Sequence, residues 1–409
     1  MLGRFWSACI IAAFIASLSQ LLFFNQQQIF DQAIAALFDV AKISVEISIG
    51  LIGLMTLWLG FFKIAERAGL IETIARGLNP LFCKLMPELP HNHPAISGIT
   101  MNLGANALGL DNAATPFGIK AMHDLQTINP LKNQLSNAQI LFLVLNTSSV
   151  TVLPVTVFLF RAQYGASQPS EVFIPILIAT SISTLVGLLS VAYVQKLALL
   201  NKTVLSYLAV LSAVPIGLTL YFSALPAEQM SIQAALFANL TLFSVIVYFL
   251  VAGLLKNVPV YDAFIDGAKQ GFDVAIKLIP YLIAMLLAIA LLRVSGLLDA
   301  LLVVLSFILQ LAHIDTAFIE AMPTALMKPF SGSGARAAMI EVMQTQGVDS
   351  FPAKVAAVMQ GSTETTFYVL AVYCGAVGIS KIRYAMSCSL LADAAGITAA
   401  IIVSYVFFA

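Results

Sequence analysis

The stretch QGSTETTF, residues 360–367, places an acid among several hydroxyl side chains at the start of an apolar segment. Hydroxyl and carboxylate oxygens at this spacing can bind a cation, take up a proton or hydrogen-bond a polar solute. In hydrocarbon an unsatisfied polar group costs several kcal/mol, and a carboxylate at mid-membrane roughly 2.5 kcal/mol or more. Glu364 is therefore the strongest candidate for a functional residue. The structural alternative is an ion pair with Lys328 or Arg336 that holds parts of the chain together.

A second polar cluster, LNTSSVT at residues 145–151, has the same character without an acid. Both clusters supply donors and acceptors for a bound solute. Their structural alternative is hydrogen bonding to the carbonyl groups of their own helices. The candidates in the two clusters are Asn146, Thr147, Ser148, Ser149, Gln360, Ser362, Thr363, Glu364, Thr365 and Thr366.

Two segments are rich in Gly, Asn, Ser and Pro, at residues 99–118 and 322–339, and both are too interrupted for a continuous span. Non-helical backbone at membrane depth is tolerated only where protein buries it or water lines it. We therefore predict two re-entrant hairpins, whose helix N-termini could face an anionic or carbonyl group. The solute-binding candidates there are Asn102, Asn106, Asn112, Ser331, Ser333 and Arg336. The structural alternative to solute binding is helix capping for the asparagines. For the Ser-Gly segment it is a turn in which Arg336 tethers the hairpin.

Asp393, inside the last apolar segment, joins Glu364 as a candidate carrier of a coupling ion or proton, with pairing to a basic group as its alternative. Glu46 follows Lys42 by four residues, which favours a helix-face ion pair over a site acid. His91 and His93 have no nearby constellation of Cys, Asp or Glu, so a solvated loop is favoured over a metal site. No nucleotide-binding, hydrolase or metalloprotease motif is present, so we expect neither a cofactor nor an enzyme.

The composition identifies the environment of these residues. The 409 residues are 60% hydrophobic and 10% charged, whereas soluble domains carry about 25% charged residues. This predicts an all-α polytopic membrane protein with the bilayer as its partner. Zero net charge gives no sign of nucleic-acid binding, and four scattered cysteines predict neither disulfides nor a zinc site.

Nine segments are long and apolar enough to cross the roughly 30 Å of hydrocarbon. They are residues 5–24, 43–62, 138–160, 172–195, 203–222, 232–255, 274–293, 355–377 and 384–408. Residues 70–86 and 296–313 are ambiguous, and the first is typical of a helix lying at the membrane interface. Lysine and arginine favour the cytoplasmic side. This predicts a cytoplasmic N-terminus and an extracytoplasmic C-terminus, provided that 296–313 does not span.

The chain also contains an internal repeat. Residues 57–74 align with 289–304, which matches Gly69 to Gly296, and residues 118–126 resemble 335–344. The best match sets residues 145–160 against 360–375, so that the two polar clusters coincide. Five spans separate the starting points of the copies, which predicts inverted repeats. In secondary transporters, such repeats bind substrate between the copies near the midplane.

Residues 1–200, with MNLGANALGLDNAATPFGIKAM and LNTSSVT, resemble the spore maturation protein A family. Residues 259–405, with MKPFSGSGA and QGSTETTFYVLAVY, resemble the spore maturation protein B family. Each half is similar to the nucleoside-recognition, or Gate, domain. The resemblance implies a transport-like membrane fold. The domains expected from it are an N-terminal helix and connector (1–42), a first Gate domain (43–200), a two-helix linker (201–258) and a second Gate domain (259–409).

The sequence thus favours a transporter-like protein of the bacterial inner membrane that binds a small polar solute, such as a nucleoside, between two Gate repeats. A homo-oligomer is a further possibility. The alternative is a non-transporting scaffold or regulator of an envelope or spore maturation process. An iron permease is disfavoured, because divalent iron would require Cys, Met or acid ligands around the site and Cys374 lies about three helical turns from the polar cluster.

Overall fold

The computed structural model describes residues 2–90, 93–108 and 111–409, and within them all side chains except those at 2–5, 111–113, 223, 227, 228, 230, 231, 274, 277, 278 and 281. The described chain is helical, and its one β contact is an isolated bridge between Gln134 and Lys381. The helices before the middle of the chain are α1 Leu2–Phe24, α2 Ile29–Arg67, α3 Leu70–Leu85, α4 Pro94–Ala107, α5 Asp111–Ile128, α6 Asn137–Thr147, α7 Val155–Gln163 and α8 Phe173–Gln195. After them come α9 Lys202–Ser223, α10 Ala227–Leu255, α11 Val260–Val294, α12 Leu297–Leu311, the short 3-10 helix η1 Ile319–Ala321, α13 Met322–Met327, α14 Gly332–Gln346, α15 Phe351–Gly361, α16 Thr366–Ala376 and α17 Ala385–Phe408.

Six helices among the described residues are long and apolar enough to cross a membrane, and they lie in α1, α2, α8, α9, α10 and α17. They coincide with six of the nine predicted spans, so the chain is a multi-pass membrane protein. The predicted span 274–293 lies within α11, whose last part forms a pair with α12 that is bent by 72°. The count of nine spans is not confirmed.

The two remaining predicted spans, 138–160 and 355–377, are not continuous helices. Residues 148–154 separate α6 from α7, and residues 362–365 separate α15 from α16. Proline at position 154 disfavours helical backbone in the residue before it and lacks an amide donor, which explains the first break. In the second break the Ser362 hydroxyl donates to Met359 O (2.8 Å), a side-chain bond that competes with the helical backbone. Each predicted span is therefore two half-helices joined by a polar, unwound segment.

The predicted repeat is visible in the order of elements. In the first copy, α2 is followed by Gly69 (φ +75°) and α3, and in the second α11 is followed by Gly296 (φ +68°) and α12. Positive φ is readily accessible to glycine, so each glycine makes the same sharp elbow possible. Helix α3 exposes its charged residues and buries Ile71 and Phe82, as expected for an interfacial helix.

Both segments predicted as re-entrant hairpins lie in pairs of packed helices. Helices α4 and α5 pack against each other on either side of residues 108–110, and α13 and α14 pack around residues 328–331. Each hairpin touches the break of its own copy. Ala107 O accepts from Val152 N (2.9 Å) in the first copy, and Pro329 O accepts from Phe367 N (2.9 Å) in the second.

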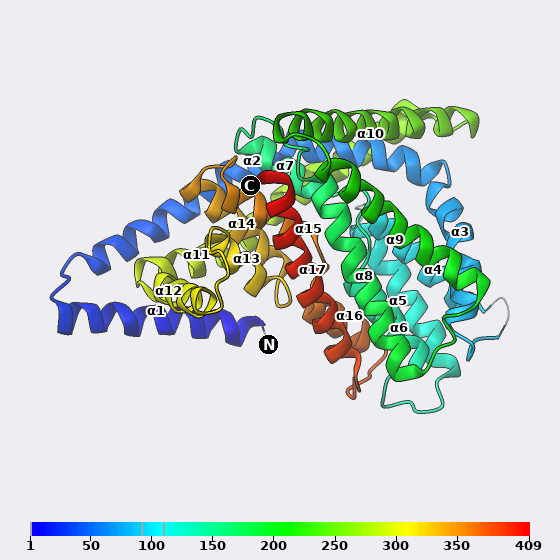
Figure 1. The fold of residues 1–409 in the computed structure, drawn as a ribbon, viewed down its shortest axis with the longest axis horizontal. Helices are drawn as coiled ribbons and strands as arrows, with labels where there is room; N and C mark the ends of the chain where they lie inside the picture. Colours follow the sequence, from blue (N-terminus) through cyan, green and yellow to red (C-terminus); the bar gives the residue numbers. More distant parts are fainter. Residues whose placement is uncertain (1, 91–92, 109–110) are drawn as a thin grey trace.

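Equivalent helices of the two copies pack against each other in antiparallel pairs. Helices α2 and α11 run side by side (Figure 1), so closely that a Cβ at Gly267 would lie 2.2 Å from Leu59 O and one at Gly271 2.6 Å from Met55 O. A later position in α11 thus contacts an earlier position in α2, so the two helices are antiparallel.

Helices α8 and α17 form the second antiparallel pair, at the centre of Figure 1. The Ser183 hydroxyl donates to Ala392 O (2.9 Å), and Gly396 lies against the same serine. Helices α8 and α17 both lie next to the two breaks.

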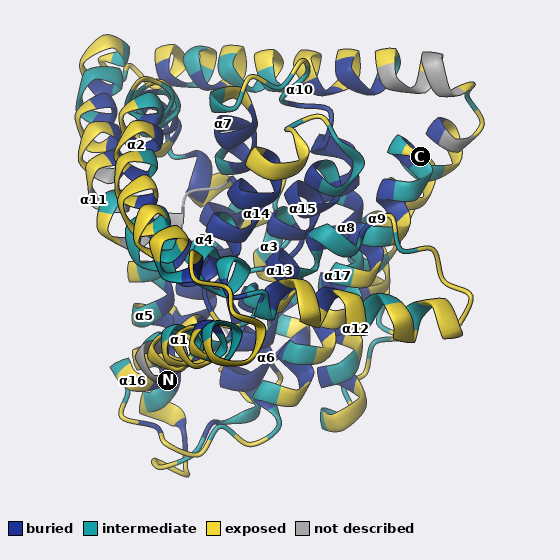
Figure 2. Ribbon diagram, turned by 90° about the vertical axis from the view of Figure 1, so that its left-hand side faces the viewer, coloured by how far each residue is buried: buried dark blue, intermediate teal, exposed yellow. Residues whose placement is uncertain are grey.

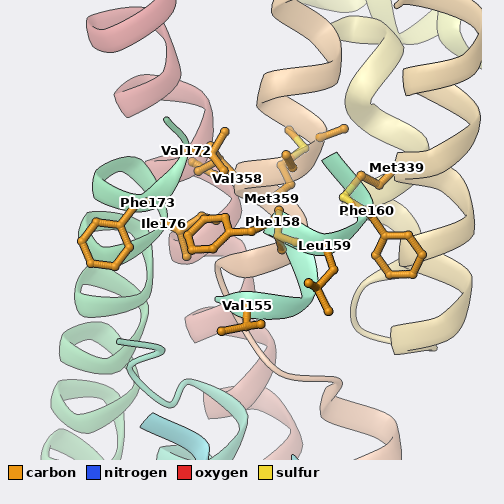
Figure 3. Close-up of a cluster of buried hydrophobic side chains, with 14 of the residues drawn as sticks. Val155, Phe158, Leu159, Phe160, Val172, Phe173, Ile176, Met339, Val358 and Met359 are labelled. Atoms are coloured by element: carbon orange, nitrogen blue, oxygen red, sulfur yellow. The ribbon is translucent and has the colours of Figure 1, made fainter. Parts of the chain in front are cut away.

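The interior is built by both copies together. Figure 3 shows side chains of α7 and α8 interleaved with Met339, Val358 and Met359 from α14 and α15. Figure 2 shows the complementary surface, with exposed residues along α1, α10, α11 and α12. Many of those exposed side chains are large and apolar, as expected for a surface that faces lipid.

Candidate functional site

The first break gathers buried polar groups at the end of α6. Thr147 Oγ1 donates to Val144 O (2.9 Å) and lies 3.0 Å from the Ser389 hydroxyl of α17. Thr184 of α8 donates to Ser148 O, and the Ser148 hydroxyl donates to Val144 O (2.8 Å). Residues 146–149 are all buried. Their hydroxyls make local helix bonds, as the structural alternative predicted, and they also reach helices of both copies.

Hairpin α4–α5 closes one side of the first break through an asparagine pair. Asn146 Nδ2 donates to Asn102 Oδ1, and Asn102 Nδ2 donates to Ala114 O (2.7 Å) and to the Tyr373 hydroxyl of α16 (3.2 Å). Asn102 and Asn106 are both buried. The side chain of Asn112 lies outside the described residues. The hairpin, the first break and a half-helix of the second copy thus meet at Asn102.

The most buried acid among the described side chains lies against the second break. Asp393 of α17 is 1% exposed, and its Oδ2 accepts from the Thr366 hydroxyl (2.7 Å) at the start of α16. The Lys328 ammonium acts on this carboxylate electrostatically. Glu364, which is only partly buried, donates its backbone N–H to Thr147 O (2.8 Å). This bond joins the second break to the end of α6, where the first break begins, so the two predicted polar clusters meet.

Hairpin α13–α14 closes the second break. Lys328 is buried and donates to Gln360 O (2.5 Å), and Thr365 Oγ1 lies against Gly332. Ser331 caps α14 by accepting from Gly334 N (3.0 Å) and lies 3.1 Å from the Ser333 hydroxyl. Arg336 Nε donates to Gly332 O (3.3 Å). The Ser-Gly segment is thus a capped turn with its arginine folded back onto it, which agrees with the structural alternative.

Three buried side-chain oxygens near the second break make no hydrogen bond of normal geometry within the described part of the chain, and the Thr363 hydroxyl among them lies close to the Asp393 carboxylate. The three oxygens are Asp393 Oδ1, Thr363 Oγ1 and Gln360 Oε1. Buried polar atoms are nearly always paired with protein, water or a ligand. These oxygens can therefore accept further hydrogen bonds, and they belong to residues of α15, of α17 and of the break between α15 and α16.

Other candidate residues lie away from the breaks. Glu46 and Lys42 form the predicted helix-face pair (3.9 Å), with both side chains exposed. His93 accepts from Ala95 N (3.3 Å) and caps α4, while His91 lies outside the described residues. Within the described residues, no three His, Cys, Asp or Glu side chains gather in a way that could hold a metal.

An ion cluster that was not predicted from the sequence joins the two copies beyond α7. Arg161, at the end of α7, is 0% exposed and bonds to Glu171, to Asp349 Oδ1 (3.1 Å) and to Val348 O (3.2 Å). Asp349 Oδ2 accepts from Ser167 N (3.0 Å), and Lys354 of α15 pairs with Glu171 (3.0 Å). We call Arg161, Glu171, Asp349 and Lys354 the Arg161 cluster. No local sequence pattern predicts this cluster, because Arg161 and Asp349 are 188 residues apart in the chain.

A second contact between the copies involves the equivalent elements. There the segment after α16 meets the segment before α6, and Leu135 N donates to Lys381 O (3.1 Å) while Lys381 N donates to Asn133 O (3.3 Å). Exposed Arg383 donates to Leu135 O (3.0 Å) and to Asn137 Oδ1 (3.1 Å). We call these five residues the Arg383 contact. A cavity of about 400 Å³ lies beside it, lined by Glu88, Asn129, Asn137 and Arg383 among others; it is not at the breaks.

Comparison with known proteins agrees with the duplicated architecture. A family model described as Gate, nucleoside recognition, matches residues 48–164 and 275–380. Spore maturation protein A of Bacillus subtilis (strain 168) is 43% identical over 148 residues, which cover 36% of this chain and 76% of that protein. Spore maturation protein B of the same organism is 43% identical over 159 residues, which cover 39% of this chain and 88% of that protein. No solved structure matches the chain.

The two matched ranges contain the two polar breaks and both hairpins, so the match includes the elements that build the candidate site. The outer boundaries of the predicted domains stay predictions. On the extent of the family match and the identity to the two relatives, this chain belongs to the Gate, or nucleoside-recognition, family of membrane proteins.

Proposed function

We propose that this protein is a transporter-like inner-membrane protein that binds a small polar solute where its two helix breaks meet. The observation that carries the proposal is the bond from Glu364 N to Thr147 O, which brings two buried polar segments from different copies into one place. Unwound backbone at membrane depth is found where it lines a site or a cavity. The buried oxygens of Asp393, Thr363 and Gln360 that make no hydrogen bond of normal geometry supply hydrogen-bonding capacity for that solute.

The proposed topology is inverted. Nine spans follow if α11 and the two broken pairs, α6–α7 and α15–α16, each cross once in addition to the six continuous helices. The antiparallel packing of α2 with α11 and of α8 with α17 supports inversion. With the N-terminus cytoplasmic and the C-terminus extracytoplasmic, Arg67 and Asp266 (2.6 Å) fall on the cytoplasmic side, and Arg161 and Asp349 on the other. Residues assigned to one side are thus in contact with each other.

The proposed binding residues come from the two breaks and the two hairpins. From the first copy we propose Asn102, Asn106, Asn112, Asn146, Thr147, Ser148 and Ser149, and from the second Ser331, Ser333, Arg336, Gln360, Ser362, Thr363, Glu364, Thr365 and Thr366. Asp393 and Glu364 are proposed carriers of a coupling proton or cation, since intramembrane acids are functional by default. The family description favours a nucleoside-like solute. We propose no enzymatic activity and no cofactor.

Thermal unfolding of the purified protein in detergent tests this function. Nucleosides, nucleobases, sugars, amino acids and divalent ions are screened across a range of pH. A ligand that binds only the folded state raises stability in proportion to its occupancy. We expect one solute class to raise the unfolding temperature, and the rise to be lost in Asn146→Ala and Glu364→Gln. The matched control is Lys42→Gln, on an exposed ion pair away from the breaks.

The second candidate function is a membrane scaffold or regulator, which the names of the two spore maturation relatives favour. In that case the buried polar groups only hold the copies together. The same screen separates the two functions. If no solute shifts the unfolding temperature, and the two site variants simply unfold earlier than the control, the scaffold is the better description.

A further inference from the structure

The Arg161 cluster joins the two copies at one end of half-helices α7 and α15. Along the chain, half-helices α7 and α15 connect the breaks to the cluster, and their buried apolar side chains, among them Val155, Phe158 and Met359, pack together (Figure 3). In the cluster, Arg161 is fully buried and binds Glu171 of its own copy and Asp349 of the other. A path from the breaks that runs between these half-helices to this end would have to pass the apolar side chains and then the cluster.

The cluster joins two segments that would have to separate if the breaks were to open toward this end of the molecule. Arg161 stands at the end of half-helix α7, and Asp349 directly precedes half-helix α15. Four further bonds cross or brace this junction, and they involve Val348 O, Gln168 O, Ser167 N and Lys354 Nζ. Two positive and two negative side chains balance each other, so the closed cluster carries no net charge. Breaking a buried ion pair is costly where the remaining charge stays buried without a partner, so Arg161 and Asp349 can separate only where water replaces the lost partner.

We propose that the Arg161 cluster is the extracytoplasmic gate of the transport path, and that separation of Arg161 from Asp349 opens the breaks to that side. This inference builds on the proposed function, since a gate requires a transported solute. The gate assigns a role to four residues outside the solute-binding set. Asp349 is the natural point of release, because its side chain is 39% exposed and water can replace its protein partners.

Cysteine accessibility in intact cells tests the gate without any knowledge of the solute. The four native cysteines are replaced, and Ser149→Cys in the first break serves as the reporter, because Ser149 is buried in the closed structure. A membrane-impermeant maleimide is added from outside. With the gate intact we expect slow labelling. With Asp349→Asn we expect labelling roughly tenfold faster, which corresponds to about 1.4 kcal/mol lost from the closed state.

Two controls separate opening from unfolding. Arg383→Gln alters the other contact between the copies and should leave labelling from outside unchanged. Ala356→Cys, a fully buried position in α15, should stay unlabelled in every variant. Lys354→Met provides a second, milder weakening of the cluster, and it should speed Ser149→Cys labelling in the same direction as Asp349→Asn.

Unchanged labelling of the Ser149→Cys reporter in both Asp349→Asn and Lys354→Met would overturn the gate. Labelling of Ala356→Cys together with the reporter would also overturn it, because the cluster would then be holding the fold rather than a path. Failure of the gate leaves the solute screen unaffected, since that screen reads binding through unfolding temperature. A failed screen with the expected labelling would instead reject the proposed solute while the gate-like opening stands.

Discussion

The Arg161 cluster and the Arg383 contact join equivalent elements of the two copies by different chemistry. In each, the segment that follows one half-helix pair meets the segment that precedes the other. The first uses a fully buried arginine and ion pairs, and the second uses a short backbone ladder with an exposed arginine beside a cavity. Duplication therefore preserved the arrangement of the backbone but not the means of closing each end. We therefore expect the end with the buried charge to lose more stability than the other end when a single side chain is changed.

The largest expected effect comes from removing the buried guanidinium. Arg161→Met leaves Glu171 buried without its closest partner, and breaking a buried pair typically costs about 3–5 kcal/mol. We expect about 3 kcal/mol, the lower end, because Lys354 still pairs with Glu171. Denaturant titration in detergent measures the loss, and Arg383→Met is the matched variant at the exposed contact, with an expected cost below about 1 kcal/mol.

A double variant sharpens this comparison. Arg161→Met combined with Glu171→Leu removes both charges, and much of the lost stability should return, because apolar replacement of a buried pair is often close to neutral. Equal losses in Arg161→Met and Arg383→Met would contradict the claim that the two contacts differ in burial and charge.

We expect the two breaks to differ in the same way, with a smaller difference in the free energy of unfolding lost on substitution. Thr366→Val removes the hydroxyl that donates to the buried carboxylate of Asp393, and we expect a loss of about 2 kcal/mol. Thr147→Val removes a bond to the neutral hydroxyl of Ser389, and about 1 kcal/mol is expected. The same titration compares them. A larger loss for Thr147→Val would mean that the break without the acid is the more strongly held.

The smallest effect concerns pH at the Arg161 cluster. Burial alone would raise the pKa of Asp349, but the hydrogen bond from Ser167 N and the charges of Arg161 and Lys354 outweigh it and lower this pKa below its ordinary value of 3.8. Since the folded-state pKa is the lower one, the stabilisation from ionised Asp349 is present above pH 3.8 and is lost as the pH falls through the folded-state value.

Stability measured between neutral pH and pH 3 tests this sign. The difference between the unmodified protein and Asp349→Asn should be constant above about pH 5 and shrink below pH 4. A difference that grew as the pH fell would show that the aspartate is held in its protonated form instead.

Much of this architecture could be predicted from the sequence because it depends on local chemistry. The pairing of Gly69 with Gly296 follows from aligned glycines, and both adopt positive φ. The hairpins follow from Gly, Asn and Pro in apolar surroundings. The two polar clusters were predicted from their matching positions in the repeat, and the bond from Glu364 N to Thr147 O joins them.

The remaining features depend on contacts between distant parts of the chain. The spans 138–160 and 355–377 were predicted as continuous because hydropathy averages over a few unwound residues. The Thr366 partner of Asp393 and the asparagine pair of Asn102 and Asn146 also require the folded chain. Arg161 was overlooked because a single arginine at the end of an apolar segment is typical of a helix end facing water.

The linker helices α9 and α10 have a consequence for how the copies find each other. They run outside the paired copies, and α10 lies along one edge of the molecule (Figure 1). A covalent connection of this kind replaces an encounter between two proteins by an intramolecular one, with an effective concentration in the millimolar range for a short linker. A weak contact such as the Arg383 contact can then remain formed, because the two halves that it joins are already linked in one chain. The fused chain thus fixes a one-to-one ratio of its two halves at synthesis.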